Sequence, residues 1–388
     1  MTVCDLTQFY SPVGGGVRRY LSEKAKHLAA AGHRHILIVP GERTERREEG
    51  DNLIYTIEAP LISRTARYRA LTNLALIEEV LERERPDIIE SGDPYQVAWK
   101  AIASGRGLGI PVVGFYHSHF PEATIRSVAK YFGGLSVLIA EEISKRYVTA
   151  LYNRFQRTLV PNPQLAMLLQ EWGVENTSTV ELGVDTAIFY PDATKGAALR
   201  EQWGLKEGRK ILLYVGRLAP EKNLRLLLGA FSHLHRMDPQ GYHLVVVGDG
   251  TLRGALQRLQ EKTGQVTWQP YCQNPATLAD FYRAATMFVH PGVHETFGLV
   301  TLESQACGTP VLGIQGSSMD RIIFNKTQRG AKKNNPLSLA EAIHAFTTAE
   351  AEREGLVVAG AVQSRYDWKN VFERLFSVYE EVIEGYDP

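Results

Sequence analysis

Two glutamates near residue 300 have a spacing that suits the recognition of hydroxyl groups. Glu295 and Glu303 stand eight positions apart. Leu299, Leu302 and Ala306 recur at helical spacing, which places Glu295 in the loop before a helix and Glu303 in its early turns. A carboxylate can accept hydrogen bonds from two neighbouring hydroxyls, such as those of a ribose or a hexose. Taken alone, Glu303 would more simply be an exposed or capping residue.

The start of this predicted helix lies between the two carboxylates. The backbone N–H groups of Gly298, Leu299 and Val300 belong to its first turn, and Phe297 comes directly before them. A helix N-terminus binds anions, because its first N–H groups have no partner within the helix and the helix dipole is positive there. The segment therefore predicts a phosphate site flanked by two hydroxyl-binding groups.

A second loop, residues 216–223, carries two cations. Arg217 and Lys222 follow an apolar run that is typical of a strand. An arginine offers a planar fork of donors and a lysine a mobile point charge, and together they suit a diphosphate. Solvated surface charge is the alternative interpretation.

Two glycine-rich loops also follow expected strands. Gly15 and Gly16, after Gly14, open a helix, and glycines at such a place allow close approach of an anion. Gly248 and Gly250 lie in a second loop whose pattern is one residue too long for a dinucleotide fingerprint, which argues against a hydride-transferring enzyme. Tight turns without a ligand are the alternative at both places.

The elements that carry these loops follow an alternating pattern. Short β-rich runs alternate with helical patterns, then the series restarts, which predicts two doubly wound domains with parallel sheets. Strands are expected at 3–9, 35–40, 53–58, 87–91, 111–116, 210–215, 243–247, 265–268, 287–290 and 310–313. Helices are expected at 70–85, 224–235, 252–263, 277–285 and 299–307. Ligands of such sheets bind at the carboxyl ends of the strands, where the loops described above lie.

Composition excludes several other classes. The 388 residues carry 43 Lys+Arg and 43 Asp+Glu, so the net charge of zero disfavours a role in nucleic-acid binding. The three cysteines form no metal-binding or CxxC pattern and are typical of a reducing cytosol. No run of 18 apolar residues predicts a membrane span.

With these motifs in view, the chain resembles the family-4 retaining glycosyltransferases (GT4), which have the GT-B fold. The resemblance covers nearly the whole chain and is strongest from residue 183 to 313. It rests on the E-x7-E pair Glu295 and Glu303, and on the segments 14–16, 216–223, 248–250 and 306–311.

The resemblance implies an α/β GT-B architecture of two doubly wound Rossmann-like domains that face each other across a cleft. Residues 1–183 would form the N-terminal, acceptor-side domain, and residues 184–366 the donor domain, which binds a nucleotide-sugar. Residues 367–388 would form a helix that crosses back to the N-terminal domain.

The resemblance also implies roles for single residues. Glu303 would bind the ribose hydroxyls and Glu295 the donor sugar, while Arg217 and Lys222 would neutralise the leaving diphosphate. His117 would contact the donor sugar and the reaction centre, although a lone histidine is more often structural; His119 is a weaker candidate. The other donor-binding residues would be Gly15, Gly16, Gly248, Gly250, Tyr271, Phe297, Gly298, Leu299 and Val300.

The expected activity is metal-independent transfer of a hexose, with retention, from a nucleotide-diphosphate sugar to an acceptor hydroxyl. The acceptor would be a glycolipid, a polysaccharide or a small molecule. No Asp-x-Asp pair suggests a divalent ion, and no cofactor is expected. A catalytically silent nucleotide-sugar-binding protein and a GT-B sugar phosphorylase or epimerase are the alternatives. The donor, the acceptor and the oligomeric state stay open.

A basic run at 62–69, with Arg18, Arg19, Lys24 and Lys26, suits contact with an anionic membrane. Solvated surface charge is again the alternative. The expected location is therefore the cytoplasm, with peripheral contact at the inner face of the membrane. A second basic segment, 321–333, departs from the family pattern and has no assigned role.

Overall fold

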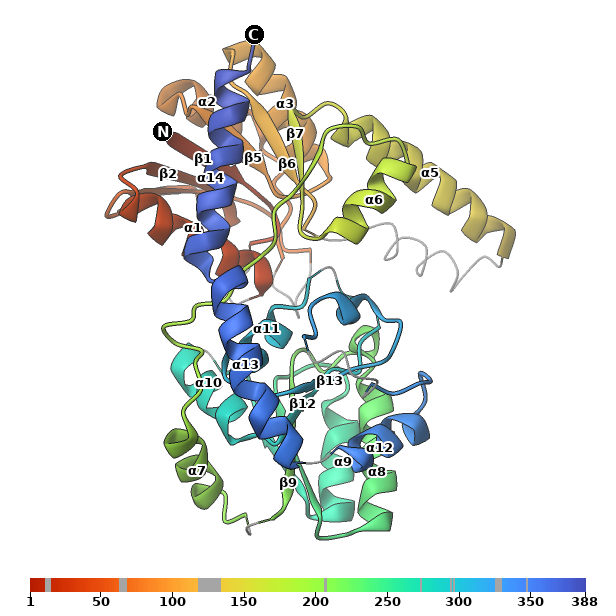
Figure 1. Ribbon diagram of the computed structural model, residues 1–388. Coiled ribbons are helices and arrows are strands. Elements are labelled where there is room, and N and C mark those ends of the chain that lie inside the picture. The colour runs from red at the N-terminus through yellow and green to blue at the C-terminus, as the bar shows by residue number, and fades with distance from the viewer. Residues whose placement is uncertain are drawn as a thin grey trace. The chain divides into compact units, whose positions relative to one another are not determined.

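The computed structural model describes residues 1–10, 15–62, 68–117, 134–205, 208–272, 274–293, 295, 297–324, 330–346 and 348–388. The chain divides into two compact units, shown in Figure 1. Unit 1 comprises Met1–Leu182 and Val371–Pro388, and unit 2 comprises Gly183–Asn370. From the sequence, the domain boundaries were expected after residues 183 and 366, and the structure places them after residues 182 and 370.

The described strands of unit 1 form one eight-stranded sheet in the order β3-β4-β2-β1-β5-β6-β7-β8. They are β1 (Thr2–Leu6), β2 (Arg34–Gly41), β3 (Glu45–Glu49), β4 (Asn52–Glu58), β5 (Ile88–Ser91), β6 (Val112–Phe115), β7 (Arg157–Val160) and β8 (Thr177–Thr179). All neighbours are parallel except β3, which is antiparallel to β4. The expected parallel sheet is confirmed for the other seven strands, and β3 is an antiparallel addition at its edge. Strand β3 is a charged, exposed edge strand, so it carries no apolar signal.

Helices cover the sheet of unit 1 and close its core. They are α1 (Gly16–Ala30), α2 (Leu74–Glu84), α3 (Gln96–Leu108), α5 (Gly134–Tyr152), α6 (Pro163–Glu171) and most of α14 (Trp368–Glu384). Helix α2 begins at Leu74 because the Asn73 side chain caps it, whereas the sequence pattern suggested a start at residue 70. The strand order reverses between β1 and β5, which makes their carboxyl ends the switch point of this sheet.

Unit 2 contains a parallel five-stranded sheet in the order β11-β10-β9-β12-β13. Its strands are β9 (Lys210–Val215), β10 (Tyr242–Val247), β11 (Val266–Gln269), β12 (Met287–Val289) and β13 (Val311–Leu312). These strands confirm the five expected from the sequence to within two residues. The switch point lies between β9 and β12.

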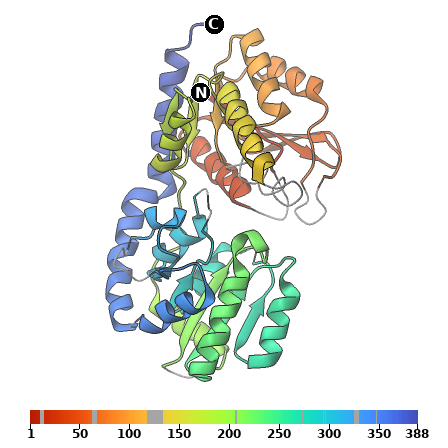
Figure 2. The same cartoon turned by 90° about the vertical axis from the view of Figure 1, so that its right-hand side faces the viewer.

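The helices of unit 2 form two sets on opposite faces of its sheet (Figures 1 and 2). One set is α8 (Leu224–Met237), α9 (Arg253–Thr263) and α12 (Pro336–Ala345); the other is α7 (Ala193–Gln202), α10 (Pro275–Ala284), α11 (Leu299–Ala306) and α13 (Thr348–Tyr366). Two 3₁₀ turns, η1 (Pro220–Lys222) and η2 (Ser318–Arg321), lie in loops after β9 and β13.

The two chain crossings between the units lie side by side within unit 2. The Val184 N–H donates to the Tyr366 carbonyl at 2.8 Å, and the Trp368 N–H donates to the Val184 carbonyl at 3.3 Å. A Cβ added to Gly183 would lie 2.7 Å from the Trp368 ring, so only glycine fits there. Among the described residues, no helix is both long and apolar enough to cross a membrane.

Candidate functional site

The switch point of unit 2 brings together two of the residues expected at the site. Lys222 ends the turn after β9, and Glu295 lies in the loop after β12. The Lys222 ammonium forms an ion pair with Glu295 Oε1, and both side chains are partly exposed. The buried His290, directly after β12, places Nε2 3.7 Å from the same oxygen. No sequence pattern marks His290, because its contact with Glu295 arises only in the tertiary fold.

The charges around Glu295 keep it ionised. Burial would raise the pKa of this carboxyl, but Lys222, His290 and Arg217 outweigh it and leave the pKa below its ordinary value. The Arg217 side chain is 65% exposed and lies 3.3 Å from Glu221. The edge therefore offers one cation fixed on a carboxylate and one that can turn toward an incoming anion.

Glycines let the loops after β9 and β10 pass in backbone contact. A Cβ on Gly248 would lie 2.1 Å from the Gly216 carbonyl oxygen, and one on Gly250 would lie 2.6 Å from that of Leu218. Both glycines have positive φ, 137° for Gly248 and 157° for Gly250. The structure thus gives the predicted donor-site glycines a packing role that brings these strand ends close together.

The end of β11 completes this edge of the sheet. The Trp268 indole donates to the Gly248 carbonyl at 2.8 Å, and the Arg253 guanidinium lies 4.3 Å from the Trp268 ring centroid. Tyr271, one of the predicted donor-binding residues, follows β11 and is half-exposed. An exposed aromatic ring beyond the strand end is available for stacking.

Helix α11 begins where the sequence predicted an anion site. Gly298 caps it with φ 91°, and a Cβ there would lie 2.3 Å from the Met319 methyl carbon. Leu299 and Val300 form its first turn. The Phe297 ring is buried and packs edge-on against Tyr366, so this side chain anchors the loop while its backbone leads into the helix.

Arg321 braces the same loop and was missed as a site residue. Its guanidinium donates to the backbone carbonyls of Glu295 and Phe297, each at 3.4 Å, and to that of Ser318. The sequence marked this position only as part of an unassigned basic segment. Residues 325–329 of that segment lie outside the described residues.

Glu303 lies in the second turn of α11 and is only 2% exposed. Its Oε2 accepts a hydrogen bond from the Tyr282 hydroxyl at 3.0 Å. The alternative of an exposed or capping glutamate is therefore wrong. A buried carboxylate with a tyrosine donor is held in one orientation, while its ribose-binding role stays a prediction.

In unit 1, His117 follows β6 and packs beside the first turns of α1. Its ring stacks on Phe115 at 4.0 Å and meets the edge of Tyr20 at 5.1 Å between centroids. Burial, and then the positive charge of Lys24, lower the pKa of His117 to about 3, with Asp5 opposing them. The imidazole is therefore neutral near pH 7. Gly15 caps α1 with φ 126°, and Gly16 begins it.

One proposed membrane contact must be corrected. Lys24 is completely buried and pairs with Asp5 and Glu90, so it cannot meet a membrane surface. Its spacing within α1 places it on the face toward the sheet, and only the buried carboxylates explain a lysine there. Residues 63–67 of the basic run lie outside the described residues, as do Gly14, His119, His294 and Thr296.

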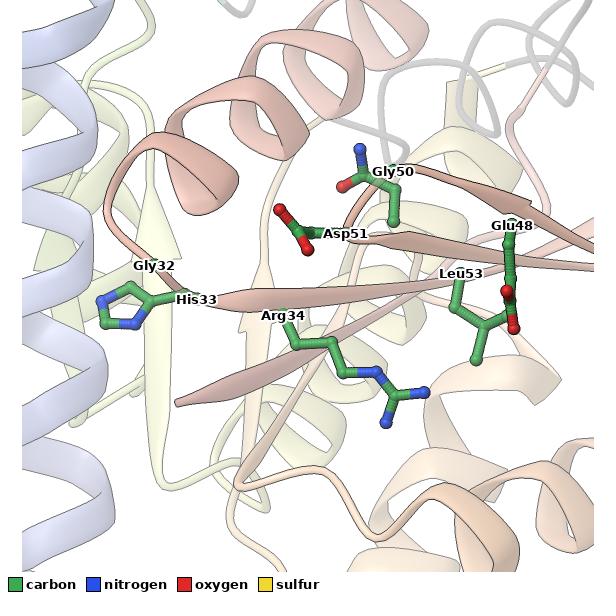
Figure 3. Close-up of a pocket in the computed structure, with 8 residues that line it drawn as sticks. Gly32, His33, Arg34, Glu48, Gly50, Asp51 and Leu53 are labelled. Atoms are coloured by element: carbon green, nitrogen blue, oxygen red, sulfur yellow. The ribbon is translucent and has the colours of Figure 1, made fainter.

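A hollow in unit 1 lies at the opposite ends of the strands (Figure 3). His33 and Arg34 at the start of β2, and Asp51 and Asn52 at the start of β4, help to line it. Amino ends of parallel strands are not where doubly wound sheets bind their ligands. Arg34 also pairs with Glu84 at 2.9 Å, so its charge is already matched.

Comparison with known proteins identifies the family of this chain. A family model described as "Glycosyltransferase Family 4" matches residues 14–188, and one described as "Glycosyl transferases group 1" matches residues 197–361. The chain is 30% identical over 352 residues, 90% of this chain and 88% of the relative, to a GDP-mannose-dependent alpha-(1-6)-phosphatidylinositol dimannoside mannosyltransferase of Mycobacterium tuberculosis (strain ATCC 25177 / H37Ra).

A GDP-mannose-dependent alpha-mannosyltransferase of Corynebacterium glutamicum is also 30% identical, over 81% of this chain and 72% of the relative. Among solved structures, sucrose-phosphate synthase from Thermosynechococcus elongatus superposes with a TM-score of 0.77 at 21% identity, covering 99% of both chains.

The fold and the site together define a nucleotide-sugar-dependent glycosyltransferase with the GT-B fold. The chain belongs to glycosyltransferase family 4, which confirms the resemblance drawn from its motifs.

Proposed function

We propose that this chain transfers a hexose, with retention and without a metal ion, from a nucleoside diphosphate sugar to an acceptor hydroxyl. The observation that carries the proposal is the Lys222–Glu295 pair at the switch point of the unit 2 sheet. It combines a cation for a leaving diphosphate with an ionised carboxylate for sugar hydroxyls. GDP-mannose is the first donor to test, because two relatives are named as GDP-mannose-dependent.

Departure of the diphosphate requires stabilisation of the charge that develops as the sugar bond breaks. Arg217, Lys222 and the first N–H groups of α11 supply positive charge and donors for that purpose. Binding would exchange the exposed Arg217–Glu221 contact for a diphosphate contact. A thermal-shift and calorimetry panel of GDP-mannose, UDP-glucose and ADP-glucose tests the donor, followed by acceptor screening with the best binder. Absence of binding by all three would contradict the donor site.

Retention is the stereochemical part of the proposal. His117 is neutral and partly exposed, and we assign it contact with the donor sugar rather than nucleophilic attack. Departure and attack on the same face of the sugar, assisted by the diphosphate, account for retention without an enzyme nucleophile. Proton NMR of the first product from an α-linked donor measures the anomeric configuration. A β-linked first product would overturn this part.

Metal independence is tested separately. The cations at the strand ends supply the positive charge that a divalent ion supplies elsewhere. Turnover in excess EDTA should match turnover in magnesium within about twofold. Loss of transfer in EDTA, restored by magnesium or manganese, would show that a metal takes part.

We assign the acceptor to the glycolipids, since one relative is named for a phosphatidylinositol dimannoside. Unit 1 also exposes Leu138, Ile139 and Ile143 on α5, a helix face suited to the surface of a bilayer. Co-sedimentation with phosphatidylglycerol vesicles tests the contact, and Leu138→Ser/Ile143→Ser should weaken it. Met167→Ser, another exposed apolar residue, is the matched control. Equal binding by both variants would argue against α5 as the contact.

A further inference from the structure

A fully buried charge cluster lies at the switch point of the unit 1 sheet. Lys24 Nζ is 2.8 Å from Asp5 Oδ1 and 3.1 Å from Glu90 Oε2, and all three side chains are at most 3% exposed. The second oxygen of Asp5 lies 2.7 Å from His35 Nε2. Burying such charges is costly, and removing one partner costs more, so the group must act as a unit.

Two tyrosine hydroxyls donate hydrogen bonds to the carboxylate of Glu90, and one of these tyrosines lies near the C-terminal end of the chain. The Tyr20 hydroxyl donates to Oε1 at 3.1 Å, and the Tyr379 hydroxyl donates to Oε2. Tyr379 lies on α14, 289 positions from Glu90. Figure 1 shows α14 running beside α1 in this unit. The C-terminal helix therefore supplies a hydrogen-bond donor that the buried carboxylate needs.

Tyr20 connects this cluster to His117. One edge of the Tyr20 ring meets the imidazole, whose other neighbour is the stacked Phe115 ring. Phe372 of α14 packs against the same Tyr20 ring at 5.8 Å between centroids. Helix α14 thus fixes Tyr20 in two ways. Phe372 packs against the Tyr20 ring, and Tyr379 orients the Glu90 carboxylate to which Tyr20 also donates.

We propose that Glu90 is a positioning residue for His117, and that α14 completes this function through Tyr379. The packing of helix α14 on the rest of unit 1 therefore affects the orientation and the protonation state of the His117 imidazole. The inference rests on the proposed function, in which His117 contacts the donor sugar. The inference adds that helix α14, which is remote in sequence, controls how His117 contacts the donor sugar.

The charges around Glu90 agree with a control that depends on pH. Asp5 on β1, Lys24 and Tyr20 on α1, and Tyr379 on α14 face the carboxyl, with His35 on β2 behind Asp5. Burial and the charge of Asp5 raise the pKa of Glu90 to about 7, while Lys24 and Tyr379 lower it. Loss of the Tyr379 donor should favour protonation of Glu90 further and weaken its hold on Tyr20.

The test compares Tyr379→Phe and Glu90→Gln with Tyr152→Phe, a buried tyrosine of the same unit outside the cluster. With GDP-mannose and the glycolipid acceptor, Tyr379→Phe should lower kcat by about threefold to tenfold, the effect of one hydrogen bond. The affinity for GDP, most of whose expected contacts lie in unit 2, should be unchanged. If Tyr379 acts through Glu90, the double variant should be no slower than Glu90→Gln alone.

A second readout follows the imidazole itself in the full chain. NMR of protein with isotope-labelled histidine resolves the His117 signal, identified by its loss in His117→Gln. Tyr379→Phe should shift this signal and Tyr152→Phe should not. Unchanged kcat and an unchanged His117 signal, with only a lower Tm, would reduce the cluster to a structural role and overturn the inference. Failure of the wild-type chain to use GDP-mannose would instead contradict the proposed donor. The NMR comparison would then still test whether Tyr379 and Glu90 position His117.

Discussion

Each unit places a lysine–glutamate pair at the switch point of its sheet, and the two pairs differ in exposure. In unit 2 the Lys222 and Glu295 side chains are 28% and 16% exposed, whereas in unit 1 those of Lys24 and Glu90 are 0% and 1% exposed. Water still reaches the first pair, so a ligand can replace it. The second pair is enclosed by Asp5 and two tyrosines and has no room for a ligand.

The neighbouring charges decide the direction of the carboxyl pKa. Burial acts on both glutamates, yet the pKa of Glu295 is lowered because Lys222, His290 and Arg217 all favour its anion. That of Glu90 is raised to about 7, because burial is complete and Asp5 adds a like charge. The pair that we propose for the donor is therefore kept charged, whereas the fully buried pair tolerates a proton.

The largest expected effect is on the buried pair. Lys24→Met should lower the free energy of unfolding by about 3–5 kcal/mol, because it leaves two carboxylates buried without their cation. Urea unfolding measures the loss. Lys26→Met is the matched control, since this exposed lysine of the same helix pairs only with Glu23, and it should cost about 1 kcal/mol or less. Equal losses in both variants would remove the distinction between the pairs.

The exposed pair should respond in activity rather than in stability. Lys222→Met should lower the transfer rate by about 10²–10³-fold, the usual effect of losing one preorganised electrostatic contact. Its free energy of unfolding should change by about 1 kcal/mol or less, because water can hydrate Glu295 in its place. Steady-state kinetics with Arg225→Met as an exposed control on α8 separate the site from general surface charge. Full activity of Lys222→Met would place the leaving-group site elsewhere.

Sequence patterns predicted the exposed site because its residues lie in loops at strand ends. Arg217, Lys222 and Glu295 follow apolar runs whose strands the structure confirms. His290 and Arg321 were missed, since a single histidine or arginine has no local pattern and their contacts with Glu295 depend on tertiary packing. The family and the GT-B fold class were confirmed as well.

Local sequence patterns could not predict the buried Lys24–Glu90 pair, for a physical reason. Lys24 was interpreted as surface charge, because a charged residue is rarely buried without partners and its partners lie on other elements. Glu90 meets Tyr379 across 289 positions, and no short-range periodicity carries that information. Strand β3 was missed in the same way, as its charged sequence forms an edge that only β4 pairs with.

Substitution of Gly298 at the start of α11 tests whether the backbone near the exposed pair tolerates a side chain. Gly298→Ala should lower the free energy of unfolding by about 1–3 kcal/mol, because φ is 91° and the new Cβ would meet the Met319 methyl carbon. Activity should fall with it, as the loop that holds Glu295 must shift. Gly254→Ala on α9 is the control, since its Cβ meets only Arg258 at 3.7 Å. Similar unfolding curves for both variants would mean that the α11 start adapts easily.

The smallest expected effect separates the two pairs by pH. With its pKa raised to about 7, folded Glu90 takes up a proton that the unfolded chain takes up only near pH 4.3, the ordinary glutamate value. Wild-type stability therefore gains from Glu90 as pH falls through 7, and this contribution is lost as pH rises through 7. Glu90→Gln has no such proton, so the difference in free energy of unfolding, wild type minus variant, should be greater at pH 5.5 than at pH 8 by about 1–2 kcal/mol.

Urea unfolding of both proteins at the two pH values measures that difference. Other groups, such as His117, whose pKa is lowered, and the buried Asp93, whose pKa is raised, titrate in both proteins and cancel to first order. For Glu295→Gln the difference should be flat between pH 5.5 and 8, because the pKa of Glu295 is lowered and its stabilising effect is lost only in acid, below its ordinary pKa. A difference for Glu90→Gln that is flat between pH 5.5 and 8 would mean that Glu90 stays ionised like Glu295. The two pairs would then differ in exposure alone and not in charge.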